Sequence, residues 1–129
     1  MPGLIELLDE IDRRRLPKAI ASSGIRHYVE AVLSVNGLLD RFSVIITGDQ
    51  VAHGKPAPDV FLAAARALDV EPQYCLVLED APAGVQAAKA AGMTCIAVPD
   101  HGVAQLDLSL ADKIVASLHD VRTFLTSDA

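Results

Sequence analysis

The sequence predicts an α/β fold, a Rossmann-like parallel sheet with helices on both faces, and three observations support this. Short apolar runs alternate along the chain with longer stretches in which apolar residues recur every three or four positions. The short runs are apolar along their whole length, which is typical of strands buried on both faces of a parallel sheet. A length of 129 residues suits one domain with a sizeable core. We expect a single domain over residues 1–129, with the least regular pattern from residue 101 onward.

The first half of the chain is predicted to hold two helices and two strands. The helices are expected over residues 3–15 and 25–35, and the strands over residues 18–21 and 44–47. Leu16-Pro17 ends the first helix, because a proline disfavours helical geometry in the residue before it. The second helix is expected to turn four side chains inward, those of Tyr28, Val29, Val32 and Leu33.

The second half of the chain continues the alternation. Helices are expected over residues 59–68, 83–91 and 121–125, and strands over residues 75–78, 94–98 and 114–115. Pro58 suits the first turn of its helix, and Gly92 suits the end of the next one. The strands follow one another through helices, so we expect them to run parallel.

The composition excludes several classes of partner. A net charge of −6 and no long run of lysine or arginine leave no electrostatic footprint for nucleic acid or an anionic membrane. The basic cluster Arg13-Arg14-Arg15 complements the dipole at a helix end. We identify neither a signal peptide nor an apolar run near the roughly 20 residues of a membrane span. Cys75 and Cys95 lack metal-ligand spacing and suit a reducing compartment, so the cytoplasm is the expected location.

Three predicted strands end in polar residues that could serve one site. In open parallel sheets, ligands bind beyond the carboxyl ends of the strands. Ser22-Ser23-Gly24 offers a hydroxyl and backbone N–H groups at a helix start, which suits an anion. Gly54-Lys55-Pro56 holds a lysine in a stiff loop, and Glu79-Asp80 offers paired carboxylates for a hard cation such as Mg²⁺.

Each of these signals also has an ordinary interpretation. A Ser-Ser-Gly stretch is commonly a turn with a helix cap, a loop lysine is commonly solvated, and acidic residues before a helix favour its dipole. The three signals converge, however, on the ends of three separate strands. A hydroxyl donor, a fixed cation and paired carboxylates together could hold a phosphoryl group and its magnesium ion.

The residues from Gly54 to Met93 carry a family resemblance. Their sequence, GKPAPDVFLAAARALDVEPQYCLVLEDAPAGVQAAKAAGM, closely resembles the third and fourth motifs of the haloacid dehalogenase (HAD) superfamily. The most similar subgroup contains β-phosphoglucomutase, phosphoglycolate phosphatase and sugar-phosphate phosphatases. The resemblance extends through PGLIELLDEI and AIASSG and weakens after Pro99. Ala81, where relatives often have serine, is a mild departure, and Gly84 is expected to allow close packing at the start of its helix.

The resemblance also implies roles for individual residues. Ser22 is similar to the hydroxyl that binds the phosphoryl oxygens, and the backbone of Ser23 is expected to assist it. Lys55 resembles the catalytic lysine that neutralises the nucleophile and the transferring phosphate. Glu79 and Asp80 resemble the acids that hold Mg²⁺ directly or through water.

The chain lacks the first motif of this family. Such enzymes attack phosphate with an aspartate of an Asp-x-Asp motif, whose second aspartate acts as the general acid and base. No Asp-x-Asp occurs in the sequence, and we expect the helical cap domain that would follow the motif to be lacking too. Asp49 and Asp100 lie on predicted loops, but neither matches the context of the motif.

The missing motif has a structural consequence. In the family it lies on a strand inside the sheet, between the strands predicted over residues 18–21 and 75–78. Those two strands are therefore expected either to pair directly or to leave unsatisfied edges, which invite a supplied strand or self-association. The sequence is compatible with a gene fragment, a start misassigned to an internal methionine, or one part of a split protein.

The activity implied by the resemblance is Mg²⁺-dependent phosphoryl transfer, with a small phosphorylated metabolite as the substrate of a phosphatase. A phosphosugar mutase is the close alternative, and a non-catalytic remnant or assembly partner is the rival for this chain alone. The four histidines, His27, His53, His101 and His119, share no ligand spacing. His53 lies close to Lys55 but is expected to be a solvated loop residue.

Overall fold

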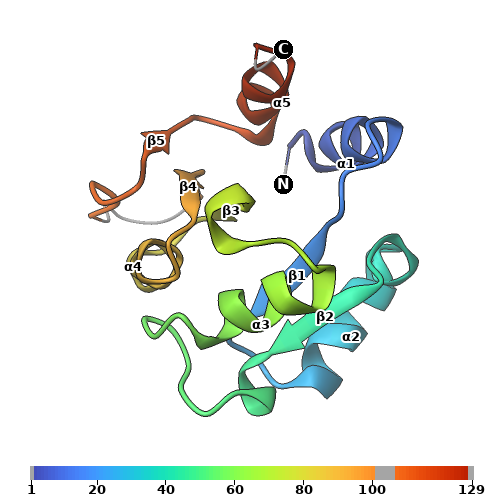
Figure 1. Ribbon diagram of the computed structural model, residues 1–129. Coiled ribbons are helices and arrows are strands. Elements are labelled where there is room, and N and C mark those ends of the chain that lie inside the picture. Colours follow the sequence, from blue (N-terminus) through green and yellow to red (C-terminus); the bar gives the residue numbers. More distant parts are fainter. Residues whose placement is uncertain (1, 101–106, 128–129) are drawn as a thin grey trace.

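The computed structural model describes residues 2–100 and 107–127, and within them helices and strands alternate from α1 to β4, after which β5 and α5 follow (Figure 1). The helices are α1 (Leu4–Arg13), α2 (Arg26–Val35), α3 (Asp59–Leu68), α4 (Pro82–Ala90) and α5 (Leu118–Ser127). The strands are β1 (Ala19–Ser22), β2 (Val44–Thr47), β3 (Leu76–Glu79), β4 (Thr94–Ala97) and β5 (Lys113–Ile114). Short 3-10 turns cover Leu39–Arg41, Gly48–Gln50 and Pro72–Tyr74. Every predicted helix and strand is present, with bounds that shift by at most three residues.

The largest shift concerns the last helix, which begins three residues earlier than predicted. Ser117 precedes its first residue, and the Ser117 hydroxyl oxygen accepts a hydrogen bond from the His119 N–H. In return the Asp120 carboxylate accepts from the Ser117 N–H at 3.1 Å. This reciprocal capping stabilises a helix start that the apolar pattern alone does not mark.

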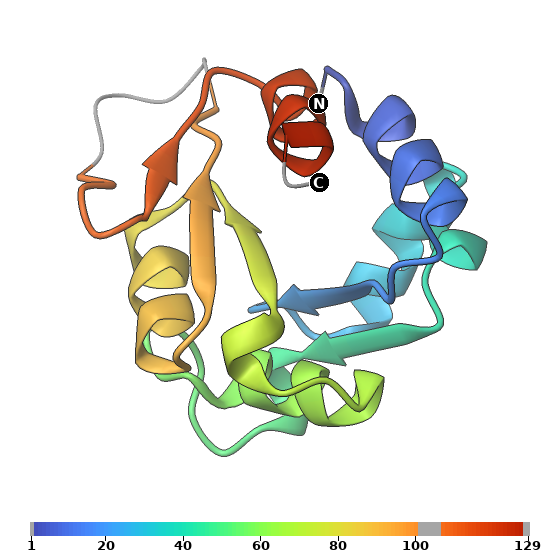
Figure 2. The ribbon, with the colours of Figure 1, turned by 45° about the horizontal axis from the view of Figure 1, so that its top comes forward.

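The strands form two parallel sheets rather than the single sheet that was predicted. One sheet pairs β1 with β2, and the other has the order β3-β4-β5. All pairings are parallel, with Ser22 opposite Thr47 at one sheet's end and Glu79 opposite Ala97 at the other's. β1 and β3 do not pair with each other, so of the two expected outcomes the structure has the unpaired edges (Figure 2).

One core lies where α3 and α4 cover the strands. Val77 and Cys95 point to this side from β3 and β4, and Val60 and Val85 meet them from the two helices. Ala21 and Ile46 of the other sheet pack against the same cluster. A single apolar layer thus spans both sheets on this face.

A second core lies on the opposite face, beneath α1 and α5. Ile96 of β4 points to this side, next to its neighbour Cys95 on the other, as expected for a strand buried on both faces. Leu7 of α1 and Val121 of α5 are buried against it. Helices therefore cover both faces, which confirms the predicted α/β architecture.

The prediction for α2 is half wrong. Val29 and Leu33 are buried, but Tyr28 and Val32 are 58% and 45% exposed instead of facing inward. α2 packs on β2 at the edge of a two-stranded sheet. A sheet of two strands is narrow and covers only one stripe of the helix. Val29 and Leu33, four positions apart, lie on that stripe, whereas Tyr28 and Val32 lie beside it.

None of the helices in residues 2–100 and 107–127 is both long enough and apolar enough to span a membrane.

Candidate functional site

The candidate site forms where the strands end, because parallel strands bring their carboxyl ends to one edge. Ser22 is the last residue of β1, and Glu79 is the last residue of β3. The loop between β2 and α3 carries Lys55. The Lys55–Pro56 peptide bond in this loop is cis.

Lys55 connects the two sheets. Its Nζ lies 2.6 Å from Glu79 Oε2 at the end of β3 and donates to the Ala21 carbonyl oxygen of β1 at 3.3 Å. The ammonium group also sits 5.0 Å from the centroid of the Phe61 ring, within cation–π range. The side chains of Lys55 and Glu79 are only 11% and 10% exposed, so the ion pair is largely shielded from water. A fixed positive charge therefore lies between the ends of the two sheets.

Glu79 has room for its carboxylate because residue 84 is glycine. A Cβ atom at Gly84, in the first turn of α4, would lie 2.0 Å from Glu79 Cδ. The other carboxylate oxygen, Glu79 Oε1, accepts a hydrogen bond from the Asp80 N–H at 3.3 Å. Asp80 itself is exposed. The two predicted metal ligands thus lie side by side, one in the ion pair and one open to solvent.

The Ser22-Ser23-Gly24 turn is held tightly against the end of β2. The Gly24 N–H donates to Ser22 Oγ at 3.1 Å, and the Gly48 N–H donates to the Gly24 carbonyl oxygen at 3.0 Å. A Cβ atom at Gly48 would lie 2.4 Å from the Ser23 carbonyl oxygen, so only glycine permits this approach of two backbones. The turn leads directly into α2, whose first N–H groups and dipole favour an anion.

A network of hydrogen bonds at the end of β2 stabilises the Ser22-Ser23-Gly24 turn and the start of α2. The buried Thr47 hydroxyl lies 2.5 Å from Asp49 Oδ1 and 2.9 Å from Gln50 Oε1. Asp49 also accepts from the Arg26 N–H at the start of α2, and Gln50 accepts from the Arg26 guanidinium. The bond from the Thr47 hydroxyl, followed by that from the Arg26 N–H, holds the pKa of Asp49 below its usual value of 3.8. The Asp49 carboxylate is thus engaged in capping α2.

The carboxylate oxygens of Glu79 and Asp80 are ligands of the type that Mg²⁺ prefers, but they would fill only part of its coordination shell. Mg²⁺ prefers oxygen ligands and commonly takes one or two carboxylates, with waters and substrate phosphates completing its shell. Within residues 2–100 and 107–127, no group of three or more histidine, cysteine, aspartate or glutamate side chains is placed to hold a metal. Water and phosphate oxygens would therefore supply the remaining ligands.

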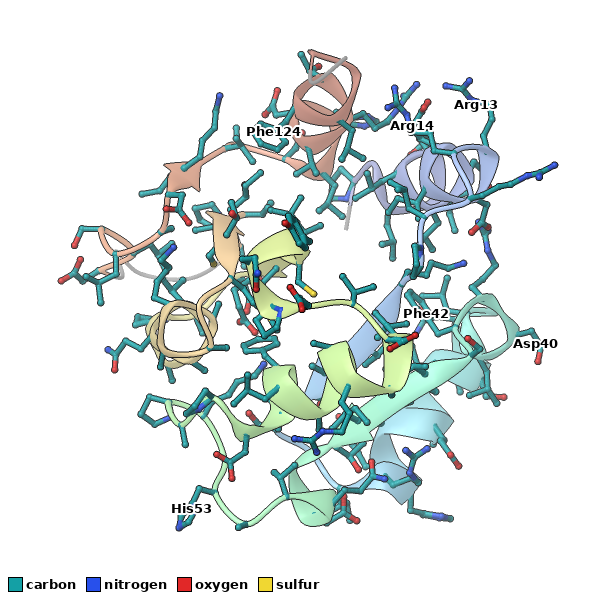
Figure 3. All side chains as sticks on the ribbon, viewed as in Figure 1. Arg13, Arg14, Asp40, Phe42, His53 and Phe124 are labelled. Carbon is teal, nitrogen blue, oxygen red and sulfur yellow. The ribbon has the colours of Figure 1, made fainter. Side chains whose placement is uncertain are left out.

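His53 is solvated, as the sequence predicted. It is 78% exposed and points away from the molecule on the loop that carries Lys55 (Figure 3). Its Nδ1 lies 3.6 Å from Asp59 Oδ2, and its backbone N–H donates to the same oxygen at 3.2 Å. His101 lies outside the described residues.

Sequence reasoning missed three residues around the site: Phe61, Thr47 and Gln50. Thr47 and Gln50 did carry a signal, because a threonine followed three residues later by glutamine is the spacing of a capping box. The structure shows both of its reciprocal bonds around the turn Gly48–Gln50. Phe61 reads as one more apolar residue of α3, and only the folded chain places its ring beside Lys55.

Comparison with known proteins identifies the family. The family model of haloacid dehalogenase-like hydrolases matches residues 1–98. The chain belongs to this family. The validoxylamine A 7'-phosphate phosphatase of Streptomyces hygroscopicus subsp. limoneus is 41% identical over 120 residues, which cover 93% of this chain and 56% of that phosphatase. Hexitol phosphatase A of Escherichia coli (strain K12) is 42% identical over 98 residues, 76% of this chain and 45% of that enzyme.

Solved structures of this HAD family share the fold. A HAD family hydrolase from Deinococcus radiodurans R1, with bound phosphate and sodium, has a TM-score of 0.90 at 30% identity and matches 98% of this chain and 59% of its own. The β-phosphoglucomutase of Clostridium difficile has a TM-score of 0.85 at 27% identity, with 99% of this chain and 55% of its own covered. These matches confirm the subgroup predicted from the motifs. The chain spans about half the length of the relatives named here.

Proposed function

We propose that this HAD-family chain carries the phosphate- and metal-binding half of a phosphatase for a small phosphorylated metabolite. The observation that carries the proposal is the position of Lys55, 2.6 Å from Glu79 Oε2 and 3.3 Å from the carbonyl oxygen before Ser22. A fixed ammonium group at the strand ends that carry Ser22 and Glu79 stabilises negative charge on a transferring phosphoryl group. The phosphatases among the relatives support this reaction type.

In this proposal the turn at the end of β1 binds the phosphate. Ser22 Oγ already accepts a hydrogen bond from the Gly24 N–H, so its own proton remains available to donate to a phosphoryl oxygen. Ser23 is an exposed residue, and its backbone N–H is the proposed second donor, just before α2. Lys55 then neutralises the charge that gathers between the two strand ends.

Glu79 and Asp80 would hold Mg²⁺ in the same proposal. When bound, the metal supplies charge stabilisation to phosphoryl oxygens as a Lewis acid. Asp80 is exposed, and one Glu79 oxygen is paired with Lys55, so Asp80 is the side chain that first meets an entering cation.

We also propose that the chain alone does not hydrolyse phosphate esters. Its sequence contains no Asp-x-Asp motif, and Asp49, whose Oδ1 accepts from the Arg26 N–H just after the Ser22-Ser23-Gly24 turn, is engaged with Thr47 and the start of α2. The attacking carboxylate would then come from a strand that lies between β1 and β3. These strands each pair on only one side within the described residues, which leaves backbone groups for such a strand.

Calorimetry and phosphate release test the site on the purified chain. Mg²⁺ binding is expected to weaken in Asp80→Asn, and inorganic phosphate binding is expected to disappear in Lys55→Ala. Unchanged binding in both variants would contradict the proposed site. No Mg²⁺-dependent phosphate release above the Lys55→Ala background is expected from sugar phosphates or an aryl phosphate. Release that Lys55→Ala abolishes would show a nucleophile within this chain and contradict the need for an added strand.

Light scattering coupled to size-exclusion chromatography tests the open sheet edges. If β1 and β3 remain unpaired in solution, the edges are expected to recruit a second copy, and the mass should rise with protein concentration. A monomer at every concentration would contradict self-association through these edges.

A mutase is the second candidate, favoured by the structural likeness to β-phosphoglucomutase. A mutase would return an isomerised sugar phosphate without net release of phosphate, which a coupled assay distinguishes from hydrolysis. We propose the cytoplasm as the location, which the free thiols of Cys75 and Cys95 support.

A further inference from the structure

Gly84 lies directly against the carboxylate of Glu79. A Cβ atom at this position would meet Glu79 Cδ at 2.0 Å and its two oxygens at 2.2 and 2.4 Å. These three atoms are the nearest neighbours of the added carbon, and all belong to one carboxylate. We infer that Gly84 is a positioning residue of the candidate site, because the absence of a side chain there leaves the volume that the Glu79 carboxylate occupies.

The backbone of α4 does not itself require glycine at this position. Gly84 lies in a regular helix, and its φ is not in the left-handed region, unlike the φ of +79° at Gly92. Alanine is a better helix former than glycine. The clashing atoms are also the end of a flexible side chain, so an added methyl group displaces the carboxylate rather than the helix. The need for glycine therefore comes from Glu79.

The carboxylate that Gly84 accommodates is the ion-pair partner of Lys55. Glu79 Oε2 lies 2.6 Å from Lys55 Nζ, and both side chains are about nine-tenths buried. If the carboxylate moves, the contacts of Lys55 that remain within the described residues are the Ala21 carbonyl oxygen at 3.3 Å and the face of Phe61. Gly84 in α4 thus affects the charge around Lys55, which lies in the loop between β2 and α3, through Glu79 at the end of β3. Its importance for phosphate and metal binding rests on the proposed function, whereas its coupling to Lys55 does not.

A four-protein cycle of wild type, Gly84→Ala, Lys55→Met and the double variant tests the inference by urea unfolding. In the wild-type background, Gly84→Ala is expected to lower the folding equilibrium constant about fivefold or more, because it breaks the ion pair. In the Lys55→Met background there is no pair to break, and the same change is expected to leave stability unchanged or raise it. Equal shifts in the two backgrounds would overturn the inference.

Gly37→Ala is the control, since Gly37 follows α2 and is not adjacent to Lys55, and an added Cβ there meets nothing within 4 Å, so that its φ of +70° costs the same in both backgrounds. It is expected to shift stability equally in both Lys55 backgrounds. If Gly84→Ala does not fold, the triple variant Gly84→Ala/Glu79→Ala/Lys55→Met removes the clashing carboxylate without leaving an unpaired ammonium and must fold as well as Glu79→Ala/Lys55→Met, and failure to do so would also overturn the inference. Calorimetry of Mg²⁺ and phosphate binding to the same proteins distinguishes the positioning role of Gly84 from the proposed phosphate and metal site. Coupling without ligand binding would retain the positioning role and contradict the proposed function.

Discussion

Replacing Lys55 by methionine leaves the Glu79 carboxylate without its counter-ion at a position that is only 10% exposed. Removing one partner of a buried ion pair costs about 3–5 kcal/mol, and removing one partner of an exposed pair costs about 1 kcal/mol or less. The exposures of 11% and 10% place this pair close to the buried limit, so we expect a loss of about 2–4 kcal/mol. Methionine keeps an apolar stem beside Phe61, and the loss therefore reports the charge.

Adding Glu79→Gln to Lys55→Met tests whether the loss of stability comes from the unpaired Glu79 charge. In Lys55→Met/Glu79→Gln no charge remains at the pair, and a neutral amide costs less to bury than a carboxylate. The double variant is therefore expected to be more stable than Lys55→Met alone, although it carries one more substitution. The stability of both is measured by urea unfolding at 25 °C and pH 7, in low salt and in 1 M NaCl.

Two results would refute this reasoning. A loss below about 0.5 kcal/mol for Lys55→Met, with no recovery on adding Glu79→Gln, would mean that the pair is solvated. An effect that vanishes in 1 M NaCl would mean the same, because salt screens exposed pairs much more strongly than shielded ones.

Three further predictions concern the surroundings of the site. Gly48→Ala places a Cβ 2.4 Å from the Ser23 carbonyl oxygen, so we expect thermal unfolding to show a loss of about 1–3 kcal/mol. The Lys89 ammonium and then the Cys95 N–H lower the pKa of Asp112, so its stabilisation is present above the ordinary value of 3.8 and is lost as the pH falls through the lowered value. Asp112→Asn should therefore be less stable at pH 7, with a difference that shrinks in acid unfolding experiments. Burial raises the pKa of Cys95 to about 11, so a thiol reagent at pH 8 should modify it only when urea unfolds the chain.

Most elements of this fold were predictable because the strands β1 to β4 are short runs that are apolar except at one end, whereas β5 has two residues and both are exposed. β4 shows why the pattern is reliable: Cys95 faces one core and Ile96 the other, so neither side of the strand tolerates a polar residue. The gathering of the candidate site residues was predictable for a related reason. Polar residues at the end of a buried strand, such as Glu79, have no place in the core and collect at the sheet's edge.

The missed features depend on what surrounds an element rather than on its own sequence. The exposure of Tyr28 and Val32 follows from the narrow sheet beside α2, and nothing in the helix itself records the width of that sheet. The division into two sheets could be stated only as one of two alternatives. The contact of Gly84 with Glu79 joins residues only five positions apart, yet its closeness depends on how α4 turns back from β3.

Helix α1 contacts both halves of the molecule, the half built on the β1–β2 sheet and the half built on the β3–β4–β5 sheet. Its polar side is tied to the β1–β2 half through Arg41, which lies 3.1 Å from Asp9 and 2.9 Å from Asp12. Its apolar side, with Leu7, is buried in the core of the β3–β4–β5 half, and Arg14 donates to the Leu125 carbonyl oxygen of α5. Figure 3 shows Arg14 on the side of α1 that faces α5.

The two sheets are thereby linked through Lys55 at the strand ends and through α1, in addition to the apolar layer that they share beneath α3 and α4. These separate attachments oppose hinge motion between the two sheets. The halves should accordingly open together, and the slowest amide protons of Ile46 and Ile96 are expected to exchange at similar rates in native-state hydrogen exchange. A much faster exchange at Ile46 would mean that the smaller half opens by itself.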